Sequence, residues 1–264
     1  MPPRSRKRRP RPEASTTSRE LLPLLASIAC IPYVLWSVCN SIAGYQDFLG
    51  RSYIEAWQHQ ALQAELSGTA YSPTAADKEN AQFHSRLATR LTPYNPDFLV
   101  TQGNTLLWDA AHATPDQPIA SDKAETMLSS YHRAIDLRPT WPDNYLQLAR
   151  AYVSLGLLGA EFQKALSSTM HYGPWKPDLM YGVIELGMAQ WERLPPDSRK
   201  VVVETIDRSQ RWNLDEKSNI RFSVSIWNLV VANNRKAEVC ALLPPDNART
   251  QRFCQPLPLQ QGKA

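Results

Sequence analysis

Histidine and cysteine are the side chains of this 264-residue sequence best suited to metal binding or covalent chemistry, and their spacing decides which chemistry is open to them. No two of the five histidines stand at the roughly three- to five-residue spacing of zinc ligands, and no Cys-x-x-Cys pair occurs. The histidines are His59, His84, His112, His132 and His171. The sequence therefore predicts no metal site and no cofactor.

Motifs that position a nucleophile or a phosphate group are also missing. The sequence has no Gly-x-Ser-x-Gly turn and no glycine-rich phosphate loop, and it holds only 10 glycines. Acidic pairs such as Asp122 and Glu125 fit a solvated helix face better than an acid–base couple. We expect no catalytic residues and predict that the protein is not an enzyme.

The four cysteines fall into two pairs with different surroundings. Cys30 and Cys39 lie inside an uncharged run, whereas Cys240 and Cys254 lie near the C-terminal end. In an oxidising compartment the second pair would form a disulfide, and closing a loop that short would contribute about 3 kcal/mol. The alternative is two free thiols, so the prediction of a disulfide depends on the compartment.

Residues 21–45 form a run without a charged side chain. As a helix rising about 1.5 Å per residue, the run is about 37 Å long, more than the roughly 30 Å of a bilayer's hydrocarbon core. Residues 1–20 carry a net charge of +5, and the rest of the chain sums to −1. Positive flanks stay cytoplasmic. We therefore predict a basic cytoplasmic arm at 1–20, a single transmembrane helix at 21–45, and an exported domain from residue 46, periplasmic if the membrane is the inner membrane of a Gram-negative bacterium.

The N-terminal region has two alternative interpretations. Ser41 and Ala43 are small residues at the spacing of a signal-peptide cleavage site, but the apolar run exceeds the roughly 7–15 residues of a signal peptide. The second interpretation is a basic arm that binds nucleic acid. The slightly acidic remainder of the chain and the adjacent apolar run argue against it, so we expect no nucleic acid partner.

Helical periodicity dominates residues 46–254, and part of it repeats. Pro96, Gly103 and Leu106 stand where Pro142, Ala149 and Tyr152 stand 46 residues later. Small residues where two helices approach, and prolines at helix boundaries, are typical of tetratricopeptide hairpins. The usual period is about 34 residues, and a polar loop at 112–121 accounts for the longer spacing of 46 residues in this sequence. We predict an all-α, tetratricopeptide-like α-solenoid over 46–254, followed by a flexible tail at 255–264; an irregular helical bundle is the alternative.

The concave face of such a stack is its usual binding surface. Repeat phase places Asp143, Leu146, Arg150 and Val153 on that face in one unit. In the preceding unit the matching positions are Asp97, Val100, Asn104 and Leu107, with Trp108 beside them. We predict that Asn104, Trp108, Asp143 and Arg150 line a groove able to hold an extended peptide or a glycan. The alternative is that they only pack one hairpin on the next.

Two stretches carry a resemblance to a known family: Ala134-Ile135-Asp136-Leu137-Arg138-Pro139-Thr140-Trp141, and Gly173-Pro174-Trp175-Lys176-Pro177. With Val239-Cys240 they resemble the VpsP-type polysaccharide biosynthesis proteins of Gram-negative bacteria. The resemblance spans roughly residues 124–240. It implies an inner-membrane protein with one N-terminal span and an exported helical-repeat domain, associated with exopolysaccharide production. It implies no catalytic residue.

These features together predict a membrane-anchored, non-catalytic scaffold or adaptor in exopolysaccharide biosynthesis or export, with protein partners in the polymerisation or export machinery. One alternative is a binding module for the polymer itself. Another is a glycan-modifying enzyme with an unrecognised site, which would require a carboxylate pair in a cleft.

Overall fold

The computed structural model describes residues 16–112, 118–211, 216–244, 251 and 253–255. Over these residues the chain forms ten α-helices and one short 3₁₀ helix, and no strand. The prediction of an all-α protein is therefore confirmed. The helices are α1 (Thr16–Leu66), α2 (Ala75–Leu91), α3 (Pro96–Ala111), α4 (Ser121–Leu137), α5 (Pro142–Ser154), α6 (Ala160–Tyr172), α7 (Pro177–Ala189), α8 (Pro196–Arg211), α9 (Glu216–Ala232) and α10 (Lys236–Leu242), with the 3₁₀ helix at Trp191–Arg193.

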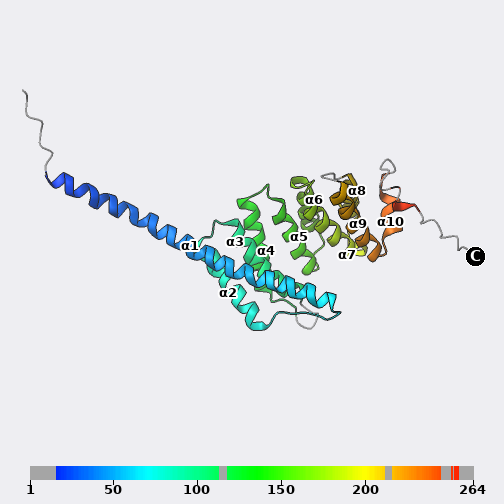
Figure 1. Cartoon of the computed structure of the whole chain (residues 1–264), viewed down its shortest axis with the longest axis horizontal. Helices are drawn as coiled ribbons and strands as arrows, with labels where there is room; N and C mark the ends of the chain where they lie inside the picture. The colour runs from blue at the N-terminus through cyan, green and yellow to red at the C-terminus, as the bar shows by residue number, and fades with distance from the viewer. Residues whose placement is uncertain (1–15, 113–117, 212–215, 245–250, 252, 256–264) are drawn as a thin grey trace, which may run out of the picture.

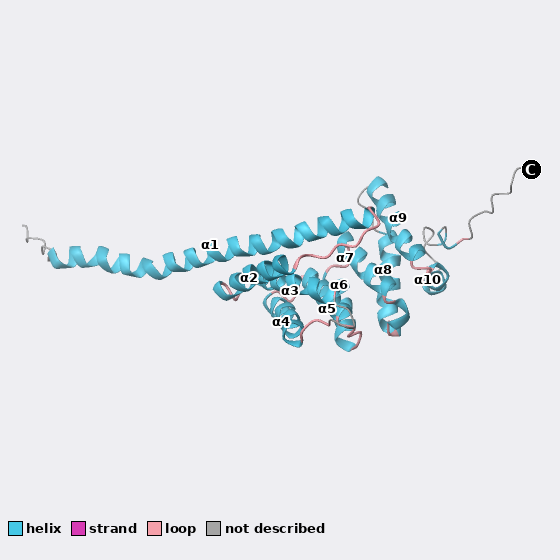
Figure 2. Ribbon diagram, turned by 90° about the horizontal axis from the view of Figure 1, so that it is seen from below, coloured by secondary structure: helices cyan, strands magenta, loops and turns pink. Residues whose placement is uncertain are grey.

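Helix α1 is 51 residues long and continuous through Pro32 and through the predicted boundary at residues 45 and 46. Its N-terminal half projects beyond the rest of the molecule in both views (Figures 1 and 2). It is the one helix among the described residues that is long and apolar enough to cross a membrane, with a mean hydropathy of 1.3 over its most apolar window. Most of the basic arm, residues 1–15, lies outside the described residues.

The folded domain begins to pack on α1 before the apolar run ends. Ala43 is fully buried in a small cluster with Ala88 of α2 and Phe98 of α3. One turn earlier, the Thr92 hydroxyl donates a hydrogen bond to the side-chain oxygen of Asn40 at 3.4 Å. The apolar run and the first helix of the domain are therefore one rigid element that overlaps at residues 40–45.

The remaining helices follow one another in contacting pairs. Helix α1 packs on α2, α3 on α4, α5 on α6 and α7 on α8, and each of the first three pairs also contacts the next through its second helix. In addition, α1 contacts α3, α3 contacts α5, α5 contacts α7, and α7 contacts α9. Figure 1 shows the resulting row of helices, which runs from α2 beside α1 to α10 at the far end.

Proline begins the first helix of three successive pairs. Pro96, Pro142 and Pro177 each occupy the first turn of their helix, where a missing N–H costs nothing and the fixed φ suits the helix. Before Pro96, the side chain of Asn95 accepts a hydrogen bond from the backbone N–H of Asp97. The 46-residue correspondence of Pro96 and Pro142 in the sequence therefore marks equivalent helix starts.

Small residues allow the close crossings that the repeat pattern predicts. Gly103 of α3 lies against the ring of Tyr131 of α4, and a β-carbon at position 103 would stand 2.6 Å from that ring. Tyr131 is fully buried, and its hydroxyl donates to the side-chain oxygen of Asn104 at 2.8 Å. The equivalent position in the next pair, Ala149, is also fully buried. From Leu106 onward one apolar core runs through the pairs as far as Leu243.

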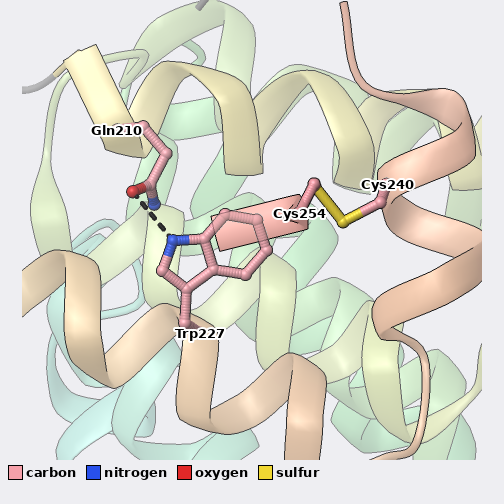
Figure 3. Close-up of a disulfide and its surroundings, with 4 residues drawn as sticks. All are labelled: Gln210, Trp227, Cys240 and Cys254. Atoms are coloured by element: carbon pink, nitrogen blue, oxygen red, sulfur yellow. Dashed lines mark hydrogen bonds between the residues drawn. A yellow bond between two sulfur atoms is a disulfide. The ribbon is translucent and has the colours of Figure 1, made fainter. Parts of the chain in front are cut away.

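Cys240 and Cys254 form the predicted pair, bonded in the structure with their Cα atoms 5.6 Å apart (Figure 3). Cys240 lies on α10, and Cys254 lies beyond it. Next to this bond, Trp227 of α9 donates from Nε1 to the side-chain oxygen of Gln210 at 3.1 Å. The bond thus attaches the end of the described chain to the last helices. Residues 256–264 of the predicted tail lie outside the described residues.

Replacement of Gly103 by alanine tests the close crossing of α3 and α4. We expect Gly103→Ala to lower the free energy of unfolding by about 1–3 kcal/mol, because the new methyl group overlaps a buried ring. Gly159→Ala is the matched control, since nothing lies within 4 Å of its β-carbon position. Denaturant unfolding of the detergent-solubilised chain measures both. Equal stabilities would contradict the described packing of α3 on α4.

Candidate functional site

Helices α1, α3 and α5 together line a concave surface, called here the α1–α3–α5 groove. It consists of two adjoining hollows of about 250 and 220 Å³, which share Ile54, Asn104 and Gln147 as lining residues. Each helix contributes one face. The lining residues recur at helical spacing: Arg51, Ile54, Glu55 and Gln58 on α1; Asp97, Val100, Thr101, Asn104, Leu107, Trp108 and Ala111 on α3; Asp143, Asn144, Gln147 and Arg150 on α5.

The four residues predicted from the sequence all line this groove. Asn104 borders both hollows, Asp143 borders the first, and Trp108 and Arg150 border the second. Two other positions that the same repeat phase points inward do not. Leu146 is buried, with its side chain beside Gly182 of α7, and Val153 packs on the core. The neighbouring Gln147 lines the groove instead.

Three charged side chains on the groove wall, those of Asp97, Asp143 and Arg150, pair with residues further along the chain. Arg51 pairs with Asp47 of its own helix, and Glu55 forms no ion pair within the described residues. Arg138 donates to both carboxylate oxygens of Asp97, at 2.9 and 3.2 Å. Lys176 donates to Asp143 at 2.8 Å. The third pair, Arg150 with Glu185, is the loosest of the three, at 3.5 Å. Of these three, Arg150 is therefore the charge that a ligand would displace from its partner most easily.

Amide side chains provide the polar groups that remain available. Asn104 accepts the Tyr131 hydroxyl with its oxygen, which leaves its NH₂ group for another acceptor. Burial raises the pKa of Tyr131, so its phenol stays neutral and keeps donating. Gln58 and Gln147 make no side-chain hydrogen bond within the described part of the chain. The groove therefore offers amide donors and acceptors of the kind that pair with a peptide backbone or with sugar hydroxyls.

Two tryptophans flank the groove, and both are partly covered. The ring of Trp108 stacks on His112, with centroids 5.0 Å apart, and meets Trp57 edge-on at 5.5 Å. Trp141 is 48% exposed, and the cationic groups of Arg138 and Lys176 lie 5.8 and 5.6 Å from the centroid of its ring. These contacts orient both rings.

A buried carboxylate lies just behind the groove, where α1 meets α2 and α3. Asp47 is 5% exposed; Arg51 contacts one of its oxygens at 2.7 Å, and the other oxygen, Oδ1, has no hydrogen-bond partner. Burial raises the pKa of the Asp47 carboxyl above its usual value, against the opposing effects of Thr101 and Arg51. The charged form is therefore poorly solvated in the folded protein.

The remaining site chemistry is limited. No three His, Cys, Asp or Glu side chains gather into a possible metal site within the described ranges. A larger hollow of about 830 Å³ lies on the outer face of α8, bordered by Trp175, Leu242 and Pro244. It contains none of the residues predicted from the sequence. Two of its cations, Lys200 and Arg211, pair with Glu204 and Asp207, and the guanidinium of Arg208 lies 5.9 Å from the ring centroid of Trp175. The α1–α3–α5 groove is therefore the candidate site.

The contribution of α1 to the site was not predicted from the sequence. The sequence predicts a helical-repeat domain from residue 46 but assigns none of residues 46–66 to the groove. The available signal was the helix pair itself: if 46–66 and 75–91 form a hairpin, the first helix of that hairpin must face the same groove as the first helices of later pairs. Gln147 was missed because repeat phase favoured its neighbour Leu146.

Comparisons with known proteins add no relative: no family model matches the sequence, and no curated protein matches it.

Substitution of Asp47 tests the cost of its buried charge. A carboxyl whose pKa is raised on folding stabilises the fold fully only below its unfolded value, and that contribution is lost as the pH rises through the folded pKa. We therefore expect Asp47→Asn to be more stable than the parent at pH 7 by roughly 1 kcal/mol. A buried charged group without a full set of partners costs about 1–3 kcal/mol, and the ion pair with half-exposed Arg51 offsets only part of that cost.

The advantage of Asp47→Asn should shrink as the pH falls through the raised pKa of the Asp47 carboxyl, because the parent then binds a proton there and loses the buried charge. Thermal unfolding of both proteins between pH 4 and 8 measures the difference, with Arg51→Gln as the control for the ion pair. A variant that is less stable at every pH would mean that the Asp47 charge stabilises the domain.

Proposed function

We propose that the protein is a membrane-anchored, non-catalytic scaffold whose helix pairs form a tetratricopeptide-like α-solenoid. The order of contacts supports this arrangement, because each helix pair packs on the next and each first helix packs on the next first helix. The equivalent prolines that begin α3, α5 and α7 support it as well. One hairpin alone leaves an apolar face exposed, and stacking buries it.

The observation that carries the functional proposal is the α1–α3–α5 groove. Its lining residues come from the first helices of three successive pairs, which is the surface that helical-repeat proteins present to extended ligands. Its free polar groups are amides and the Glu55 carboxylate, and three of its charged residues form ion pairs with residues further along the chain. Such a surface suits reversible binding of a protein segment.

We assign the apolar half of α1 as a single transmembrane span, with the basic arm in the cytoplasm and the domain in the periplasm. The charge asymmetry around the run supports this orientation. The Cys240–Cys254 pair supports it independently, since disulfides persist in oxidising compartments. The resemblance to VpsP-type proteins favours the inner membrane and a role in exopolysaccharide biosynthesis or export, with partners in that machinery.

The polymer itself is a second candidate ligand. Uncommitted amides at Gln58 and Gln147 beside the aromatic ring of Trp108 are a combination that suits sugar hydroxyls and sugar rings. Titration of the detergent-solubilised chain with oligosaccharides of the secreted polymer distinguishes this candidate from a protein ligand. Binding of the oligosaccharide that Gln147→Arg abolishes would favour it.

Changing the charge of the groove lining tests the scaffold proposal. We expect Arg150→Glu, and independently Gln147→Arg, to remove a crosslinked partner from pull-downs of native membranes, because both change the groove lining. Lys164→Glu is the matched control, a charge reversal at an exposed position of α6. If all three variants retain the same partner, the groove is not its binding site. Circular dichroism of each variant confirms that the fold is kept.

Thiol counting tests the compartment. In protein taken from membranes, denaturation under non-reducing conditions should expose two alkylable thiols, Cys30 and Cys39, because Cys240 and Cys254 are paired. Reduction before alkylation should raise the number to four, and intact-mass spectrometry measures it. Four reactive thiols without reduction would place the domain in a reducing compartment and contradict the proposed orientation.

A further inference from the structure

The turn between α2 and α3 lies level with the end of the apolar run of α1. The hydrogen bond from Thr92 to Asn40 fixes this turn beside residue 40, and the burial of Ala43 against Ala88 and Phe98 fixes the next turn of α1. Tyr94, within this turn, is 80% exposed. The exposed Tyr94 side chain therefore lies at a defined height along α1.

That height corresponds to the edge of a bilayer. A hydrocarbon core of roughly 30 Å accommodates about 20 helical residues, which, centred on the uncharged run at 21–45, are about residues 23–43. Neighbouring helix axes lie about 8–10 Å apart, and an average tilt of about 20° moves a neighbour by only about 3 Å along the membrane normal. The α2–α3 turn therefore falls within a few ångströms of the boundary between hydrocarbon and headgroups.

The residues exposed at this level are of the types that favour that boundary. Tyr45 and Phe48 of α1 are 60% and 63% exposed, and Tyr94 joins them. Arg90 and Arg133 are exposed cations nearby, and Arg133 donates to the backbone oxygen of Pro93 at 3.1 Å. Aromatic rings settle among lipid headgroups, and arginine pairs with their phosphates.

We propose that this end of the domain, formed by Tyr45, Phe48, Arg90, Tyr94 and Arg133, is seated in the headgroup layer and binds the lipid surface. The inference rests on the proposed span, since it uses α1 as the reference for depth. Its consequence is that the domain does not swing on a tether. The bilayer holds it at a second point, so that the α1–α3–α5 groove keeps one orientation to the membrane.

Fluorescent labels at three heights along the full chain test the proposal. In a Cys30→Ser, Cys39→Ser background, Tyr94→Cys places an environment-sensitive maleimide dye on the turn, and Leu66→Cys places it at the far end of α1. The two residues are 80% and 77% exposed, so neither substitution removes a core contact. Native Cys30, labelled in Cys39→Ser, reports the span. The proteins are reconstituted in nanodiscs that contain phospholipid with a nitroxide on the headgroup or on the acyl chain.

We expect the headgroup nitroxide to quench the dye at position 94 at least about twofold more than at position 66, because residue 66 stands about 39 Å further along α1 than residue 40. Aqueous iodide should show the reverse order. If the acyl-chain nitroxide quenches Cys30 while positions 94 and 66 behave alike, the span stands and this inference is overturned. If Cys30 is not quenched, the span is wrong and the inference falls with it.

Discussion

The continuity of α1 is the constraint on which the rest of the structure depends. The two halves of this uninterrupted helix have different surroundings. The first half projects from the molecule without a neighbouring helix, and from Asn40 onward the helix packs on α2 and α3. A glycine- or proline-rich linker between the two halves would have allowed independent motion. Without one, the position of every later helix pair is set relative to the apolar half, and so is the α1–α3–α5 groove.

The interface that joins α1 to the domain differs from the core beyond it. Its buried residues include the hydroxyl residues Ser85 and Thr101, which lie beside Gly50 of α1, whereas the later pairs share a continuous apolar core. These hydroxyls are satisfied within their own helices: Ser85 donates to the backbone oxygen of Gln82, and Thr101 to that of Asp97. Helices that satisfy their polar groups locally can pack without leaving donors unpaired, and Gly50 gives them the close approach. Asp47 is the exception, because no local partner reaches its second oxygen.

The sequence allowed much of the local structure to be predicted and less of the site. Proline and glycine act through steric rules that need no tertiary context, so the starts of α3 and α5 and the crossing at Gly103 followed directly from Pro96, Pro142 and their neighbours. Which face of a helix lines a groove depends on the crossing angle to the next pair, and repeat phase leaves an error of one residue. That error separates Leu146, which is buried, from Gln147, which lines the groove. The part played by α1 depended on the pairing of helices, which composition does not reveal.

The distribution of charge along the groove constrains what it can bind. Asp97, Asp143 and Arg150 pair with residues 41, 33 and 35 positions later. Arg138 and Lys176 lie in the connections that lead into α5 and α7, and Glu185 lies on α7, so the ion pairs tie α3 and α5 to the segments that follow their own hairpins. A strongly charged ligand would compete with these half-exposed ion pairs, each of which contributes about 0–1 kcal/mol. A ligand that uses the amides of Asn104 and Gln147 and the looser Arg150 leaves the two shorter bridges intact. Extended, weakly charged chains are therefore the ligands that the groove can hold without loosening the stack that forms it.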